Sequence, residues 1–128
     1  MQLGYVIVYV PDVAASVAFY ESAFGLERRF VHESGQYAEL ETGATALAFA
    51  GETFTPTHGG FRPNRVGEPA GGAEIALLSE NVEASFAKAL RAGAQSLIEP
   101  ERKPWGQTVS YVRDNSGFIV EICSPVGG

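Results

Sequence analysis

The sequence predicts an α+β fold in which two βαβββ repeats form a curved mixed sheet with both helices on its convex face. The order strand–helix–strand–strand–strand occurs twice, and the second set follows the first at an offset of 69 residues, so that Tyr5 matches Glu74 and Val13 matches Val82. An internal repeat of this kind constrains the fold more than local propensities do. Hydrophobic residues make up 45% of the 128 residues, enough for one core. We expect a single domain over residues 1–128, with a first half at about 1–50, a loop at 51–72 and a second half at about 73–128.

The first half opens with an apolar run. β-branched and aromatic residues from Gly4 to Val10 predict a strand, which Pro11 ends. Asp12 is a good N-cap for a helix over residues 13–24, where apolar residues recur at helical spacing, and Gly25 supplies the stop. Three strands are expected to follow, with a hairpin turn at Ser34-Gly35 between the first two. Their expected ranges are 27–33, 36–41 and 44–50.

The second half repeats this order. Residues 74–78 predict a strand, and Asn81 is placed to cap a helix that carries Val82, Phe86 and Leu90 and ends near Gly93. The turn residues 114–117 separate the last two strands. The three remaining strands are expected at 95–99, 107–113 and 117–124.

Side-chain alternation along these strands separates two kinds of face. A purely apolar set is expected under the helices, and a mixed set faces away from them. Glu74 and Glu121 fall on the mixed face. A carboxylate within an apolar strand needs a partner, because burying an unpaired charge is costly. A metal ion, a ligand, or a structural Arg or Tyr would each provide such a partner. If the two carboxylates lie close together without a metal, the pKa of one of them should rise.

Composition excludes several classes of function. The net charge is −6, and the nine basic residues are scattered, which argues against a nucleic-acid partner and against an anionic membrane surface. There is no apolar run of transmembrane length and no basic leader at the N-terminus. The single cysteine, Cys123, excludes an internal disulfide and favours a reducing compartment. We therefore expect a cytoplasmic protein.

The segment Gly51–Gly72 contains six Gly and three Pro in 22 residues. A loop of this length is uncommon within a compact domain. It is either a plain connector between the halves or a flap over a pocket. As a flap, it would contribute Phe54, His58, Phe61 or Arg62.

Three motifs carry a resemblance to a known family. They are the opening residues 10–13 and 19–26, the segment Trp105-Gly106-Gln107, and the closing residues 112–122, which read VRDNSGFIVEI. Together with the repeat, the chain resembles the vicinal oxygen chelate superfamily of glyoxalase, bleomycin-resistance and dioxygenase-like proteins. The resemblance implies the glyoxalase-like fold. It also implies a homodimer in which Tyr5 of one chain faces Glu74 and Glu121 of the other.

The resemblance also implies four metal-ligand positions. Carried onto this chain, they are Tyr5, Leu47 or Ala48, Glu74 and Glu121. A phenol is a poor ligand at neutral pH, and neither Leu nor Ala ligates. Glu74 and Glu121 remain as candidate catalytic and metal-binding residues, and two carboxylates suit a divalent ion such as Mg²⁺ or Mn²⁺. The two histidines, His32 and His58, are expected to be ordinary surface residues.

Several side chains are candidate ligand contacts on the same surface, because Tyr and Trp offer an apolar wall with one polar group. These candidates are Tyr5, Tyr9, Phe49, Trp105, Gln107 and Tyr111. Three functions stay open. The first is a bleomycin-resistance-like protein that binds a small aromatic or cationic molecule. The second is a metal-dependent lyase, isomerase or dioxygenase, and the third is a non-catalytic relic whose surface serves dimer packing.

Overall fold

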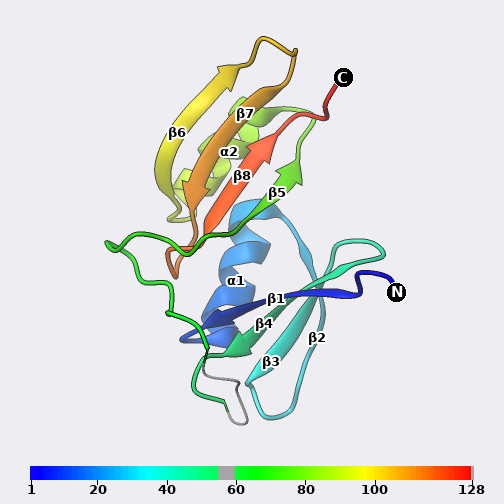
Figure 1. Ribbon diagram of the computed structural model, residues 1–128, viewed down its shortest axis with the longest axis vertical. Helices are drawn as coiled ribbons and strands as arrows, with labels where there is room; N and C mark the ends of the chain where they lie inside the picture. Colours follow the sequence, from blue (N-terminus) through cyan, green and yellow to red (C-terminus); the bar gives the residue numbers. More distant parts are fainter. Residues whose placement is uncertain (55–59, 128) are drawn as a thin grey trace.

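The computed structural model describes residues 1–54 and 60–127, and each half forms its own four-stranded mixed sheet (Figure 1). The sheet orders are β1-β4-β3-β2 and β5-β8-β7-β6. The pairs β1–β4 and β5–β8 are parallel, and the other neighbours are antiparallel. The elements of the first half are β1 (Tyr5–Val10), α1 (Val13–Phe24), β2 (Glu27–Val31), β3 (Tyr37–Glu41) and β4 (Ala46–Gly51). Those of the second are β5 (Glu74–Leu78), α2 (Val82–Arg91), β6 (Gln95–Arg102), β7 (Thr108–Arg113) and β8 (Ile119–Cys123).

The predicted α+β fold with two βαβββ repeats is confirmed, and one feature of it differs. The eight strands form two sheets instead of one continuous ladder, because β1 and β5 are the end strands of their sheets and do not pair with each other. Strand bounds shift by a few residues, most of all in β6, which runs on to Arg102 instead of ending at 99. Neither of the two helices in the described ranges is long and apolar enough to cross a membrane.

Capping residues define where both helices begin and where α1 ends. Asp12 accepts a hydrogen bond from the Ala15 amide at 3.0 Å, and Asn81 accepts one from Ala84 at 3.1 Å. Gly25 ends α1 in the left-handed region at φ +67°, where a side chain would be strained. Each helix covers one face of its own sheet, and α1 packs against α2. The core therefore runs without interruption from one half to the other.

A buried hydrogen bond joins the two halves. Tyr20 on α1 is fully buried and donates to Oδ2 of Asp114 at 2.7 Å. Asp114 lies between β7 and β8, and its Oδ1 accepts from the amides of Ser116 and Phe118. Burial, and then the nearby Asp114 carboxylate, raise the pKa of Tyr20 well above its ordinary value. A neutral tyrosine thus holds the first half onto the turn of the second.

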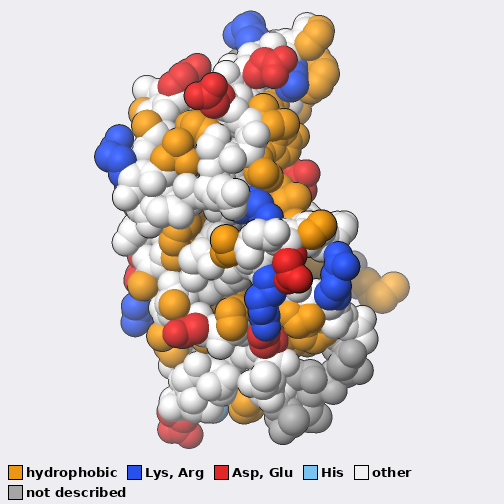
Figure 2. All heavy atoms as spheres, turned by 90° about the vertical axis from the view of Figure 1, so that its left-hand side faces the viewer, with side chains coloured by type: hydrophobic (Ala, Val, Ile, Leu, Met, Phe, Trp, Pro, Cys, Tyr) orange, Lys and Arg blue, Asp and Glu red, His pale blue; other side chains and the backbone are white. Residues whose placement is uncertain are grey.

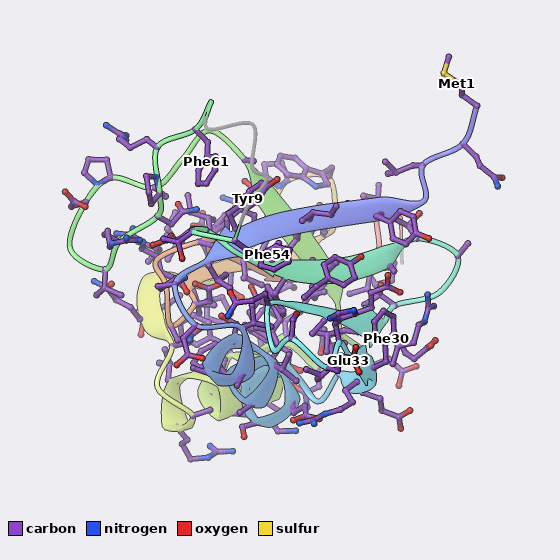
Figure 3. All side chains as sticks on the ribbon, turned by 90° about the horizontal axis from the view of Figure 1, so that it is seen from below. Met1, Tyr9, Phe30, Glu33, Phe54 and Phe61 are labelled. Atoms are coloured by element: carbon purple, nitrogen blue, oxygen red, sulfur yellow. The ribbon has the colours of Figure 1, made fainter. Side chains whose placement is uncertain are left out.

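The linker between the halves is fastened at both ends. Phe61 stacks on Tyr9 of β1 with ring centroids 4.5 Å apart (Figure 3). Arg65 pairs with Glu52, donating from Nη1 at 3.1 Å, and its carbonyl oxygen accepts from buried Arg113 at 3.1 Å. Basic and acidic side chains accordingly lie together on the face that the linker crosses (Figure 2). The linker packs against both halves.

Candidate functional site

The faces of the two sheets that point away from the helices, called the open faces here, follow from the strand register. On the first sheet, Tyr5, Ile7 and Tyr9 pair with Ala46, Ala48 and Ala50 of β4. On the second, Ala76 of β5 pairs with Glu121 of β8. Ile7 is the repeat equivalent of Ala76, so Ala48, and not Leu47, is the equivalent of Glu121. Leu47 points into the core.

Glu74 and Glu121 lie together on the open face of the second sheet. They come from the neighbouring strands β5 and β8, and Glu74 is exposed. Burial, and then the neighbouring Glu121, raise the pKa of Glu74 above its ordinary value. This direction agrees with the rise expected for one member of a close carboxylate pair.

Three further polar groups extend this pair into a row. Tyr111 is the register partner of Glu121 on β7, and burial, followed by Glu121, raises the pKa of Tyr111. Cys123 lies two residues after Glu121 on β8, on the same face, and is 2% exposed. Burial and Glu121 raise the pKa of its thiol to about 11, so at neutral pH it is a neutral thiol and not the nucleophilic thiolate.

The row ends at an exposed tryptophan. Trp105 lies in the turn between β6 and β7 and is 58% exposed, but its Nε1 donates to Oε1 of Gln107 at 2.8 Å. Gln107 is 9% exposed and donates in turn to the carbonyl of Ser124 at 2.9 Å. The buried amide thus fixes the indole orientation while one side of the ring faces solvent.

The aromatic contacts predicted in the first half lie on different faces of its sheet. Tyr5 is on the open face and 57% exposed, and Tyr9 is on the same face beneath Phe61. The prediction for Phe49 is wrong, because it pairs with Val8 on the helix side, is fully buried, and packs against Tyr20 at 4.8 Å. A one-residue error in register moves a side chain to the opposite face.

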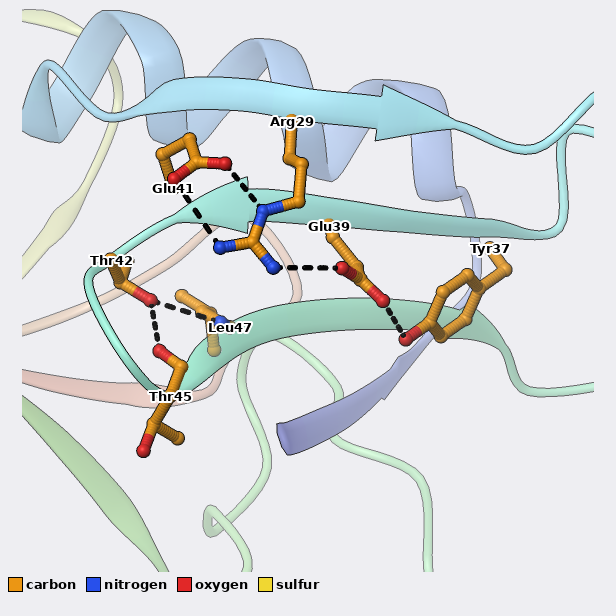
Figure 4. Close-up of polar contacts among 7 residues, drawn as sticks. All are labelled: Arg29, Tyr37, Glu39, Glu41, Thr42, Thr45 and Leu47. Carbon is orange, nitrogen blue, oxygen red and sulfur yellow. Dashed lines mark hydrogen bonds and ion pairs between the residues drawn. The ribbon is translucent and has the colours of Figure 1, made fainter. Parts of the chain in front are cut away.

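A polar network on the open face of the first sheet was missed (Figure 4). Arg29 on β2 donates to both oxygens of Glu41 and, at 3.3 Å, to Oε1 of Glu39. Glu39 is 7% exposed, and its Oε2 accepts from Tyr37 at 2.7 Å. Burial, and then Glu39, raise the pKa of Tyr37 to about 12, and the bond to Arg29 lowers the pKa of Glu41. The alternation of Glu39 and Glu41 indicates that they share a face, but it does not show that Arg29 reaches them.

The residues at the four implied ligand positions do not fit a metal centre. Tyr5 and Ala48 offer no ligand suited to neutral pH, which leaves two carboxylates, and a catalytic centre typically takes three or more protein ligands. Glu39, the register partner of Ala48, already forms an ion pair with Arg29. Across residues 1–54 and 60–127, no three His, Cys, Asp or Glu side chains cluster tightly enough to hold an ion.

The two predicted surface histidines have separate outcomes. His32 is exposed, and its Nδ1 lies 2.8 Å from Oγ of Ser34, so it closes the β2–β3 turn. His58 lies outside the described residues, as does its predicted contribution to a flap. Phe54, another flap candidate, is 45% exposed.

Two hollows flank the seam between β1 and β5. The larger hollow, of about 440 Å³, is almost entirely apolar. The hydroxyls of Thr42 and Thr45 on its wall donate to the backbone carbonyls of Thr45 and Leu3. The smaller, of about 230 Å³, is lined by residues of β1, the linker and β5. Glu74 and Tyr9 both border the smaller one.

Two βαβββ repeats, each with a helix packed on one face of a four-stranded mixed sheet, define a class of small α+β proteins. Within that class, the chain belongs to the Glyoxalase/Bleomycin resistance protein/Dioxygenase superfamily, whose family model matches residues 2–122. This confirms the resemblance that the sequence motifs indicated.

Individual relatives are distant in sequence. The uncharacterized protein YraH of Bacillus subtilis (strain 168) is 25% identical over 124 residues, which cover 95% of this chain and 97% of that protein. A glyoxalase-related enzyme from Fulvimarina pelagi superimposes with a TM-score of 0.82 at 22% identity, covering 98% of this chain and 88% of the other. A lactoylglutathione lyase from Agrobacterium tumefaciens gives 0.71 at 20% identity, covering 96% and 92%. At these identities, the two solved structures establish the fold alone.

Proposed function

We propose that the protein binds a small aromatic or cationic organic molecule on the open face of its second sheet. The observation that carries this proposal is the row of polar side chains on this face, which runs from Glu74 and Glu121 past Cys123 to Gln107 and the Trp105 indole hydrogen-bonded to it. A ligand cation would meet the carboxylates, and a flat ring would stack on the exposed face of the indole.

The electrostatics of the row favour a cation over an anion. The ion pairs formed by the described residues do not include Glu74 or Glu121. The pair therefore has unneutralised acidic character. Trp105 is held in one orientation before any ligand arrives, which reduces the entropy lost on binding.

The metal-dependent lyase, isomerase or dioxygenase is the weaker alternative, because the first half contributes Tyr5 and Ala48 where ligands would be needed. Inductively coupled plasma analysis after dialysis against Mn²⁺, Ni²⁺ or Zn²⁺ distinguishes the two. The binding function predicts far less than one equivalent of metal per chain, and one stoichiometric equivalent would favour the enzyme.

A second copy of the chain is the proposed partner. Within the described residues, β1 and β5 each have one edge that pairs with no strand, and Tyr5, Ile7 and Leu78 are 57%, 46% and 68% exposed on the open faces. Unprotected apolar edges are usually covered in a working protein. A twofold dimer that places the first open face of one chain against the second open face of the other would cover both. Leu78→Glu is then expected to convert a dimer into a monomer in light scattering, and a wild-type monomer would contradict the proposal. The single buried Cys123 supports a cytoplasmic location.

A thermal-shift screen of aromatic amines, cationic antibiotics and neutral aromatics tests the binding function, since a ligand of the native state raises the melting temperature. A true ligand should lose its effect in Glu121→Gln and in Trp105→Ala. Glu83→Gln, on the exposed first turn of α2, is the matched control and should keep it. A hit that both site variants retain, or a screen in which every cation is silent, would contradict the proposal.

A further inference from the structure

The cavity of about 230 Å³ under the linker combines features that the larger hollow lacks. Its walls come from both halves and from the linker, and they include aromatic rings, one guanidinium, one amide and one carboxylate. The lining includes Ile7, Tyr9, Phe61, Arg62, Asn64 and Glu74. The larger hollow offers no charged side chain.

Its apolar part is built to take a ring. Tyr9 and Phe61 stack with their planes 16° apart, so each ring covers one face of the other, and the stacked pair borders the cavity (Figure 3). Ile7 and Phe118 add aliphatic and aromatic surface from β1 and from the turn before β8. The volume holds roughly eight waters at about 30 Å³ each, and it lies below the roughly 300–1,000 Å³ of drug-sized sites. The matching ligand therefore carries a single ring.

Its polar part has one group of each charge. Arg62 is exposed, and it forms no ion pair with any residue in the described part of the chain. Asn64 uses its side-chain oxygen for the amide of Gly71 at 3.1 Å, which leaves its NH₂ group as a donor next to Arg62. Glu74 supplies the negative charge on the β5 side.

We infer that this cavity is a subsite for a small zwitterion with one apolar ring, of the chemical class of an aromatic amino acid. Arg62 and Asn64 bind its carboxylate, Glu74 binds its ammonium group, and the ring lies against Tyr9 and Phe61. An anion alone would face Glu74, and a cation alone would face Arg62, so a ligand carrying both charges fits best. Because Glu74 belongs also to the open-face row, the subsite rests on the proposed function and names its ligand class.

The test uses L-phenylalanine as the probe, with 2-phenylethylamine and 3-phenylpropanoate as analogues that each lack one charge. Calorimetry should show each analogue binding at least about tenfold more weakly, the effect of losing one charge-assisted hydrogen bond. In ¹H–¹⁵N spectra, L-phenylalanine should shift the amides of Ile7, Phe61 and Phe118. The indole signal of Trp105, the chain's one tryptophan, should stay in place.

The variant Arg62→Gln separates a specific role from a general one. It should weaken L-phenylalanine about tenfold or more and should not weaken 2-phenylethylamine, because that analogue has no carboxylate to lose and no longer faces the positive charge of Arg62. Arg91→Gln, at the end of α2, is the matched control and should change neither affinity.

Three results would overturn the subsite. The first is that Arg62→Gln weakens all three probes equally, or weakens none of them. The second is a shift of the Trp105 indole without shifts at Ile7 and Phe61, which would leave the proposed open-face function standing. The third is L-phenylalanine that fails to bind up to its solubility limit, while a screening hit lost in Glu121→Gln would still support the proposed function.

Discussion

The hydrogen bond between Tyr20 and Asp114 joins the two halves, and its contribution to the free energy of unfolding can be measured. Tyr20→Phe removes the O–H donor but keeps the ring that packs against Phe24 and Phe49. Asp114 is 3% exposed, so its Oδ2 would be left buried without this donor, while Oδ1 keeps two amides. A lost hydrogen bond to a buried charged group costs about 1.5–3 kcal/mol. In a domain of this size, that corresponds to a fall in Tm of roughly 5–12 °C.

Urea denaturation at neutral pH measures this difference. Tyr5→Phe is the matched control, because its ring is 57% exposed and the same hydroxyl is removed from the surface. The pKa of Tyr20 is raised in the folded protein, so its stabilising contribution is complete below the unfolded value near pH 10 and is lost as pH rises through the folded value. A loss below about 0.5 kcal/mol, the range of neutral surface changes, would refute the reasoning.

Two further variants probe the row. Glu74→Gln should raise the free energy of unfolding at neutral pH, because the raised pKa of Glu74 means that folding favours its protonated form. This gain in stability should vanish as the pH falls below the ordinary Glu pKa near 4. A variant less stable than wild type at pH 7 would contradict the expectation. Gln107→Leu should free the indole of Trp105, lowering the anisotropy of its fluorescence and costing about 1 kcal/mol of stability. Unchanged anisotropy in a folded variant would show that packing alone holds the ring.

The sequence predicts the helices and the acidic pair because each depends on local chemistry. Asp12 and Gly25 act within one helical turn of the segment they limit, so α1 is predicted to the residue. The face on which Glu74 and Glu121 lie follows from the two-residue period of β5 and β8, because the alternate residues of these strands are clearly apolar. The helix limits and the face that each carboxylate takes do not depend on which strands are neighbours, but the approach of the two carboxylates depends on β5 lying beside β8.

The errors arise where the cross-strand register decides the outcome. Residues 44–50 are small and apolar on both faces, so alternation does not show which side Phe49 takes. On β2, an irregularity in register between Arg28 and Phe30 sets which side chains reach the open face. The contact of Arg29 with Glu39 and Glu41 depends on this pairing, and single-strand patterns do not contain it.

The two halves keep one backbone plan but place their carboxylates differently. In the second half, Glu121 stands on the inner strand β8 with Tyr111 beside it on β7. In the first, Ala48 takes the inner position, and the carboxylate of Glu39 is one strand further out on β3. There Arg29 forms ion pairs with Glu39 and with Glu41, whereas the ion pairs of the described residues leave Glu121 out. A cationic group that approaches the open faces therefore meets carboxylates already paired with Arg29 in the first half, and an acidic pair outside the described ion pairs in the second. Ligand binding should therefore depend on second-half carboxylates far more than on first-half ones.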